Sequence, residues 1–340
     1  MFSVSELLKI DNVAVEFHAR KGLLSSTKVQ ALDGVSIQLN KGETLALVGE
    51  SGSGKTTLAR VCLRLVDITR GEVYFDGQNI TNLKGKQLRS FRKNAQGIFQ
   101  DPFSSLDPYM SVRQIVEEPL IILKQGSAAE RYDRICTALE EVRLQPAGEI
   151  ATKFTHQLSG GQRQRVAIAR ALVTEPELIV ADEPVSMIDA SSRAEILYLM
   201  NELREKRGTA FVYITHDIAT AYHFAQRIAV MYLGKIVERG AMSEVISNPL
   251  HPYTEALLKA VPKPDPQNRF RRRATVKGEA PSSMAPPSGC RFHPRCSFKF
   301  GPCATVEPRL QSVRESHMAA CHLFASESVP YAQKSVDSSG

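Results

Sequence analysis

The chain has 340 residues, 43% of them hydrophobic, and a formal net charge of +7. This length allows one larger α/β domain with an appendage, and no apolar stretch approaches the ~18 residues of a membrane helix. The segment from Met1 to Glu6 lacks the basic start and apolar core of a signal peptide. We therefore expect a soluble cytosolic protein that reaches a membrane only through partners.

The opening of the chain predicts an antiparallel β portion. Residues Leu7 to Phe17, Val35 to Leu39 and Gly71 to Gly77 alternate in polarity or are rich in β-branched side chains. Between the last two of these segments, the apolar run Thr44 to Val48 predicts a buried parallel strand. Thr57 to Leu63 predicts a helix shortly after that strand.

A helical insertion and further buried strands follow. From about residue 101 the pattern becomes helical, and we predict a helical subdomain at about 101–165. Leu178 to Ala181 and Ala210 to Ile214 then predict strands, with a helix near Arg193 to Lys206 between them. This alternation is typical of a parallel sheet covered on both faces, so we predict an α/β fold that ends near Gly240.

A glycine-rich segment lies between the predicted strand at 44–48 and the predicted helix. It reads Gly49-Glu50-Ser51-Gly52-Ser53-Gly54-Lys55-Thr56 and is followed by Thr57. Small residues let successive backbone N–H groups converge on phosphates, while Lys55 supplies a charge and the Thr56 hydroxyl a Mg²⁺ ligand. The positive end of the following helix favours the same phosphates. The context predicts an ATP site rather than a chance glycine-rich turn.

Acidic and polar side chains follow the other buried strands. Asp182 and Glu183 end the strand at 178–181, at the sheet edge where open parallel sheets bind ligands. Because neighbouring side chains on a strand point to opposite faces, we expect Asp182 near Mg²⁺ and Glu183 at the attacking water. His216 follows the next strand and can donate a hydrogen bond to the γ-phosphate. Gln100, at the entrance to the helical insertion, can bind Mg²⁺ or orient water.

A second glycine motif precedes a later helix. In Leu158-Ser159-Gly160-Gly161-Gln162, Ser159 is a predicted N-cap and the glycines leave backbone amides available to an anion. We expect this motif to lie too far from the phosphate loop of its own chain to contact the same nucleotide. A head-to-tail dimer would place each ATP between one subunit's phosphate loop and the other's Ser-Gly-Gly-Gln.

Together these residues resemble the ATP-binding subunits of ABC transporters over essentially the whole chain. The family's motifs occur in order: the phosphate loop at 49–56, the Q-loop at Gln100, the signature at 158–162, Walker B at 178–183 and the switch histidine His216. The resemblance implies an ABC-type P-loop ATPase, a mostly parallel sheet with an antiparallel portion, in which Lys55, Gln100, Glu183 and His216 serve hydrolysis.

Two further assignments follow from the same resemblance. Asp189 stands at the D-loop position, where it would act between the two ATP sites, although Ser186-Met187-Ile188-Asp189 has Met-Ile in place of the common small-Leu pair. Phe17 is the expected aromatic that stacks on adenine, and the segment from Ala19 to Val29 looks like an insertion beside it.

A narrower resemblance points to the dipeptide/oligopeptide importer ATPases. It rests on the strings Ile98 to Pro108, Asn248 to Thr254 and Pro287 to Cys296. It implies a place at the cytoplasmic face of the membrane, with two permease subunits, a second ATPase subunit and an extracytoplasmic solute-binding protein. The subfamily also imports nickel and β-linked oligosaccharides, and the Met-Ile variant is similar to the sugar branch. Peptides are the expected solute, with these two as alternatives.

Four cysteines gather in the C-terminal extension that we place at 241–340. Cys290, Cys296, Cys303 and Cys321 have the spacing C-x5-C-x6-C-x17-C. In a reducing cytosol clustered thiols favour a metal over disulfides, and cysteine-only ligation suits zinc or an iron–sulfur cluster. Family members with this pattern are similar in holding a [4Fe-4S] cluster, which we expect here, with His293 as a rival ligand for zinc. The alternative is four unligated thiols.

An arginine run is the only support for a rival class, a soluble ABC protein acting on nucleic acid or the ribosome. The run comprises Arg269, Arg271, Arg272 and Arg273, with prolines on both sides, which is typical of a solvated linker. Proteins of the rival class usually carry two ATPase units, whereas this chain has one set of motifs. We therefore predict no nucleic-acid partner. A redox-sensing tail is a third class, and it requires a solvent-accessible cluster.

Overall fold

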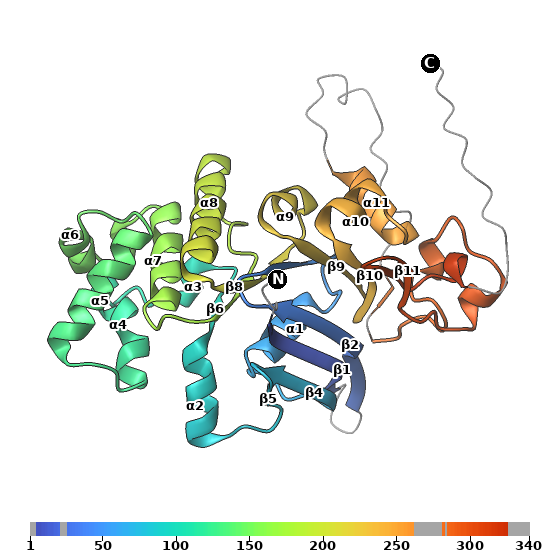
Figure 1. The fold of residues 1–340 in the computed structure, drawn as a ribbon, viewed down its shortest axis with the longest axis horizontal. Coiled ribbons are helices and arrows are strands. Elements are labelled where there is room, and N and C mark those ends of the chain that lie inside the picture. The colour runs from blue at the N-terminus through green and yellow to red at the C-terminus, as the bar shows by residue number, and fades with distance from the viewer. Residues whose placement is uncertain (1–4, 21–25, 262–280, 283, 326–340) are drawn as a thin grey trace, which may run out of the picture.

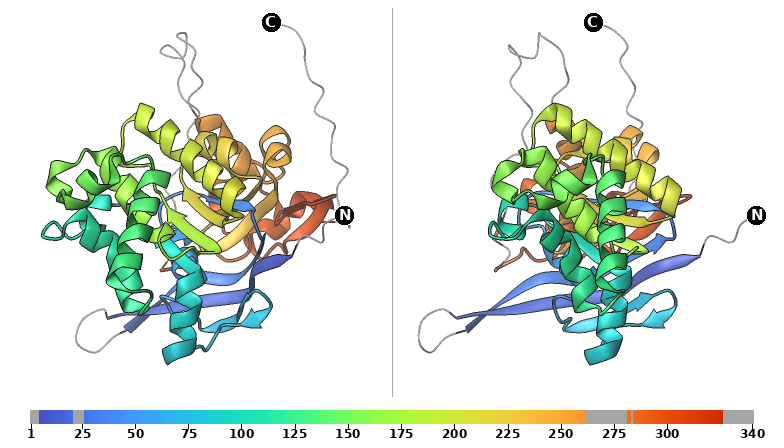
Figure 2. Two further views of the ribbon diagram at one scale, coloured as in Figure 1. Left: turned by 60° about the vertical axis from the view of Figure 1, so that its left-hand side comes forward. Right: turned by 90° about the vertical axis from the view of Figure 1, so that its left-hand side faces the viewer.

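A four-stranded antiparallel sheet forms the lower part of the molecule in Figure 1. The computed structural model describes residues 5–20, 26–261, 281–282 and 284–325. The sheet has the order β2-β1-β4-β5, from β1 Glu6–Arg20, β2 Ser26–Asn40, β4 Arg70–Phe75 and β5 Gln78–Asn79. The predicted antiparallel portion is confirmed, and β1 and β2 form a long ribbon that projects from the body (Figure 2).

The central layer is an eight-stranded sheet in the order β11-β12-β10-β9-β3-β8-β7-β6. The strands are β3 Thr44–Val48, β6 Ala95–Ile98, β7 Leu178–Asp182, β8 Ala210–Thr215, β9 Arg227–Tyr232, β10 Lys235–Ala241, β11 Gln311–Arg314 and β12 His317–Ala319. Neighbours from β9 to β6 pair in parallel, whereas β10, β11 and β12 pair antiparallel. The predicted mostly parallel core is therefore present.

Helices cover the central sheet and form an arm beside it (Figure 1). They are α1 Lys55–Cys62, α2 Gly85–Asn94, α3 Pro102–Ser105, α4 Val112–Ile122, α5 Ala128–Glu141, α6 Ala147–Thr152, α7 Gly160–Leu172, α8 Ala190–Arg207, α9 Ile218–Phe224, α10 Met242–Ser247 and α11 Pro252–Ala260. Helices α4 to α7 make up the arm. Ser111 and Ser127 begin α4 and α5 with capping boxes, which satisfy backbone donors that would otherwise be unpaired.

Strand β3 shows how the two faces of the central sheet are buried. Leu45 and Leu47 pack into a core with α1 and the antiparallel sheet, whereas Ala46 and Val48 pack into a second core with α7 to α10. All five residues of β3 are buried, as expected for a strand covered on both sides. Among the described residues, no helix combines the length and the apolarity needed to cross a bilayer.

The C-terminal extension shares this architecture. Strands β11 and β12 join the central sheet through β10, where Glu238 and Arg239 pair with Ala319 and Met318. Phe292, from the cysteine segment, belongs to the same buried core as α7 to α10. The sheet and this core thus continue past Gly240. The predicted arginine run lies outside the described residues.

Candidate functional site

A cavity of about 330 Å³ lies at the carboxyl ends of the parallel strands. Its lining includes Ser51, Gly52, Gly54, Lys55, Thr56, Thr57, Gln100, Glu183 and His216, with Val29 and Ala31 from β2. These residues follow β3, β6, β7 and β8, which lie side by side in the sheet, so parallel pairing brings their ends to one edge. The structure therefore brings part of the predicted phosphate loop, together with Gln100, Glu183 and His216, to one cavity, and Asp182 is not among its lining residues.

Lys55 is the buried cation of this cavity, with 7% of its surface exposed. Its Nζ donates to the carbonyls of Gly49 and Glu50, at 2.8 and 2.9 Å. Burial lowers the pKa of Lys55, and the carboxylates of Glu183, Asp182 and Glu50 oppose that shift. A desolvated ammonium held by neutral carbonyls is well prepared to bind phosphate oxygens.

Some residues of the phosphate loop line the cavity, and others contact the rest of the protein. Ser51, Gly52 and Gly54 line the cavity, whereas Gly49 packs against the neighbouring strand: a Cβ there would lie 2.2 Å from the carbonyl oxygen of Met231. Gly49, Glu50 and Ser53 do not belong to the cavity lining. Their predicted contact with nucleotide stays a prediction, and their observed contacts are with the protein.

Asp182 and Thr56 form the part of the site suited to Mg²⁺. Asp182 is 7% exposed, and the Thr56 hydroxyl hydrogen-bonds to it. Burial raises the pKa of Asp182, and the hydrogen bond from Thr56 opposes this shift. A carboxylate beside a hydroxyl is the hard oxygen pair that Mg²⁺ prefers, so these residues fit the predicted ion.

Glu183 lies between Gln100 and His216. Its Oε2 accepts a hydrogen bond from Gln100 Nε2 at 2.9 Å, and its Oε1 lies 3.2 Å from His216 Nδ1. The strand ends at Asp182, and Glu183 has a φ of 47°, in the left-handed region. The side chain is therefore aimed by a turn, and the strand alternation that we invoked for it does not apply beyond Asp182.

The signature motif forms the beginning of α7 and does not line this cavity. Ser159 Oγ accepts from Gln162 N at 3.2 Å, and the Gln162 side chain accepts from Ser159 N at 3.0 Å. The predicted N-cap is thus confirmed as a capping box. Gly161 lies against α8, where a Cβ would meet Ser192 Oγ at 3.2 Å. The signature and the phosphate loop of one chain do not share a cavity.

Asp189 and Phe17 lie outside the same cavity lining. Asp189 begins α8, and its Oδ1 accepts from Ser191 Oγ and Ser192 N at 2.6 and 2.9 Å. These hydrogen bonds lower the pKa of Asp189, so it is an ionised N-cap. Phe17, 40% exposed, pairs across the ribbon with Val29, which does line the cavity. Their roles between sites and at adenine stay predictions.

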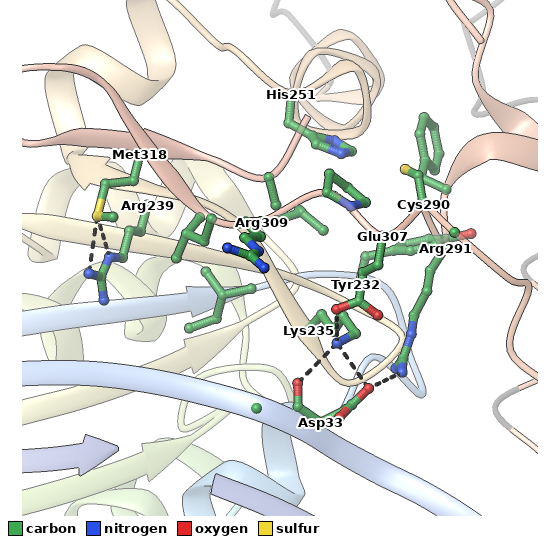
Figure 3. A pocket seen from close by; sticks show the side chains of 18 of the residues that line it. Asp33, Tyr232, Lys235, Arg239, His251, Cys290, Arg291, Glu307, Arg309 and Met318 are labelled. Carbon is green, nitrogen blue, oxygen red and sulfur yellow. Dashed lines mark hydrogen bonds and ion pairs between the residues drawn. The ribbon is translucent and has the colours of Figure 1, made fainter. Parts of the chain in front are cut away.

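Ion pairs connect the C-terminal extension to the core, and these pairs could not be predicted from the sequence. Arg295 donates to both carboxylate oxygens of Glu50, at 2.8 and 3.2 Å. Figure 3 shows a second junction, where Asp33 on β2 binds Lys235 and Arg291. Arg295 lies in a string that we linked to the peptide importers, but the string alone carried no information on its partner.

The four predicted metal ligands are free thiols in one small segment. Burial, and to a smaller extent the neighbouring thiols, raises the pKa of Cys290 to about 11 and of Cys321 to about 12. Across the described ranges, no three His, Cys, Asp or Glu side chains are grouped so that they could hold a metal ion. The arrangement of Cys290, Cys296, Cys303 and Cys321 therefore does not confirm the expected metal-binding segment.

A phosphate loop, a buried Mg²⁺-type carboxylate and a glutamate between an amide and a histidine define a P-loop ATPase. The ABC transporter family matches residues 32–186, and the oligopeptide/dipeptide transporter C-terminal region matches residues 237–303. The fold is similar to the dimeric ATP-binding cassette MJ0796, with 33% identity, a TM-score of 0.62 and coverage of 69% of this chain and 99% of that one.

Relatives that align over most of the chain assign it to a narrower group within the ABC transporter ATPases. The chain is 44% identical to the oligopeptide transport ATP-binding protein AppF of Bacillus subtilis, over 94% of this chain and 98% of AppF. It is 43% identical to the dipeptide transport ATP-binding protein DppF of Haemophilus influenzae, over 90% of this chain and 93% of DppF. The chain belongs to the ABC transporter ATPases, in the family of peptide-transport ATP-binding proteins.

Proposed function

We propose that this chain hydrolyses ATP to drive an importer of dipeptides or oligopeptides, bound at the cytoplasmic face of the membrane. The observation that carries the proposal is the single cavity lined by the phosphate loop, Gln100, Glu183 and His216. In it Glu183 holds the attacking water, and His216 donates a hydrogen bond to the γ-phosphate. Lys55 offsets the charge that develops on the transferred group.

Asp182, Thr56 and Gln100 would hold the magnesium ion. When bound, Mg²⁺ neutralises phosphate charge and supplies electrostatic stabilisation. The Thr56–Asp182 hydrogen bond supports two of these ligands. Gln100 donates to Glu183 through its Nε2, and its Oε1 is the atom that would bind the ion or accept a hydrogen bond from water.

The second half of the site would come from another ATPase subunit. In this chain Ser159 to Gln162 lie outside the phosphate-loop cavity, which supports a head-to-tail arrangement. The partner is an identical chain or a paralogue, and two permeases and a solute-binding protein complete the importer. Glu183→Gln should trap the ATP-bound dimer, measured by sedimentation with and without MgATP. If Glu183→Gln stays monomeric in MgATP, both alone and with each coexpressed ATPase subunit, the head-to-tail arrangement is contradicted.

The solute assignment rests on the peptide-transport relatives and the matching C-terminal region. We would measure ATPase activity of the reconstituted importer with its binding protein loaded from a short-peptide panel, a β-oligosaccharide panel or nickel. Stimulation by peptides that disappears in Glu183→Gln supports the proposal. Stimulation by sugars or nickel alone would replace the solute while leaving the ATPase assignment intact.

We also propose that Cys290, Cys296, Cys303 and Cys321 bind a [4Fe-4S] cluster, with zinc as the alternative. Support comes from their spacing and from the match of residues 237–303 to the oligopeptide/dipeptide transporter C-terminal region. Anaerobic purification followed by iron, sulfide and zinc analysis would test this. Absorbance near 400 nm with about four irons per chain supports the cluster, and one zinc per chain supports the alternative. A protein that contains neither iron nor zinc contradicts both proposals.

A further inference from the structure

Glu50 of the phosphate loop connects the loop to the C-terminal extension. Its carboxylate binds Arg295, and its backbone N–H donates to the hydroxyl of Tyr253 at 2.8 Å. Its carbonyl oxygen accepts from Lys55 Nζ. Every polar group of Glu50 is therefore engaged, and the partners of its carboxylate and of its backbone N–H both lie beyond residue 240.

The environment of this junction is shielded from solvent. The side chain of Arg295 is 7% exposed and that of Glu50 is 27% exposed, so the pair is screened less than a surface ion pair. A guanidinium that contacts both oxygens of one carboxylate also fixes the orientation of that carboxylate.

Aromatic packing holds both partners of Glu50 in place. Tyr253, on α11, lies against Tyr232 of β9 with ring centroids 4.6 Å apart. Phe292 contacts both tyrosines at 5.3 Å, and Arg295 also donates to the Tyr232 hydroxyl at 3.4 Å. Because β9 pairs in parallel with β3, the strand that leads into the phosphate loop, Arg295 and Tyr253 are anchored to the sheet that carries the loop.

We propose that Arg295 and Tyr253 are positioning residues for ATP, which hold Glu50 and thereby keep the phosphate loop in its phosphate-binding geometry. They act through Glu50 on the carbonyls that orient Lys55, without touching the nucleotide. A loop ordered before binding loses less conformational entropy when ATP arrives, so the effect falls on affinity. This inference rests on the assignment of the loop to ATP and is independent of the transported solute.

The test is equilibrium binding of a fluorescent ATP analogue to the full-length chain, with ATPase kinetics of the reconstituted importer beside it. Arg295→Gln and Glu50→Gln should each raise Kd about tenfold, while kcat at saturating ATP changes less than about twofold. The double variant should bind no worse than the weaker single variant, because both changes break the same pair and the double change leaves no unpaired charge.

A matched control separates positioning from general stability. Glu307→Gln removes a 2.6 Å ion pair between the same extension and Lys235 of β10, and none of the phosphate-loop contacts described above involves Glu307, so Kd should stay within about twofold. If Arg295→Gln does not fold, Arg295→Lys takes its place. The single variant Arg295→Lys should then have a lower Kd for ATP than the double variant that also carries Tyr253→Phe. In that case Tyr253→Phe alone, which removes only the hydroxyl, should still raise Kd about threefold.

Three results would overturn the inference: an unchanged Kd in folded Arg295→Gln and Tyr253→Phe, an equal rise in Glu307→Gln, or multiplicative effects of Arg295→Gln and Glu50→Gln. Failure of the wild-type chain to bind the ATP analogue is a different outcome. It would contradict the ATP assignment of the loop itself.

Discussion

The side-chain amide of Gln100 donates to Glu183 Oε2 across 2.9 Å, which joins the second residue after β6 to the residue after β7. On the other flank of β7, His216 follows β8 and lies 3.2 Å from Glu183 Oε1. The strand order β8-β7-β6 thus gives Glu183 one polar neighbour from each adjacent strand. Gln100 also precedes the helical arm, so it links Glu183 to the segment that leads into the arm.

Glu183→Gln should remove hydrolysis while keeping ATP binding. The amide cannot accept the proton of the attacking water, so we expect kcat to fall about 10²–10⁴-fold with little change in the Kd for MgATP. Phosphate release and nucleotide binding measure the two quantities. Glu140→Gln, an exposed glutamate on α5, should leave both unchanged. Activity above a tenth of wild type in Glu183→Gln would exclude Glu183 as the base.

His216→Ala should lower kcat by about 10²-fold with KM within about twofold, because a donor to the transition-state charge is lost and ground-state binding is kept. The effects of His216→Ala and Glu183→Gln should not multiply, since in the proposed mechanism the two side chains act on the same water and phosphate. Steady-state kinetics of both single variants and the double variant give the comparison. A raised KM at unchanged kcat would instead assign His216 to binding.

Gly49→Ala should disrupt the phosphate loop. A Cβ would lie 2.2 Å from the Met231 carbonyl, a backbone atom that cannot move aside, so we expect a loss of about 1–3 kcal/mol in stability and at least tenfold weaker ATP binding. Gly148→Ala is the matched control: it lies in α6, with Tyr132 Oη 3.6 Å from the added Cβ, and should be neutral or stabilising by up to ~1 kcal/mol. Urea unfolding and ATP binding compare the two variants, and equal behaviour would contradict the packing argument.

The residues that line the phosphate-loop cavity could be placed from the sequence because local patterns determine their positions. A buried strand, a glycine loop and a helix locate Lys55 and Thr56, and parallel strands bring Gln100, Glu183 and His216 to one edge. The direction of the Glu183 side chain could not be derived in this way. It depends on a left-handed residue after the strand, where alternation no longer applies.

Contacts between segments that lie far apart along the chain could not be predicted from a single sequence. Glu50 and Arg295 are separated by 245 positions, and nothing in the local pattern of either residue names the other. The pairing of β12 with β10 is a similar case: β12 has three residues, too few for a clear period-two pattern. Covariation between relatives is the kind of signal that could reveal such contacts.

His251 should make stability depend on acidity. Burial lowers its pKa to about 3, against about 6.5 in the unfolded chain, so between these values the unfolded state binds more protons and stability falls as the pH falls. The expected loss is about 2 kcal/mol at pH 5 relative to pH 7.5. Its Nδ1 accepts from Tyr253 N at 3.1 Å, a cap that His251→Asn can replace without the titration.

Urea unfolding at pH 7.5 and pH 5 would measure this contribution of His251. The difference in free energy of unfolding between the two pH values should be smaller by about 2 kcal/mol in His251→Asn than in wild type. Each protein is compared with itself, so a constant loss of packing in the variant cancels. An unchanged difference would mean that other groups carry the acid sensitivity.

The short strand β12 has a consequence for solubility. It occupies the open side of β10, and its His317 supplies a 2.7 Å partner to the fully buried carboxylate of Glu238. A chain cut after residue 261 would keep every nucleotide motif but leave β10 as a bare sheet edge and remove the His317 partner of Glu238. Such an edge is a template for strand pairing with other copies, so the C-terminal segment also protects the cassette from aggregation.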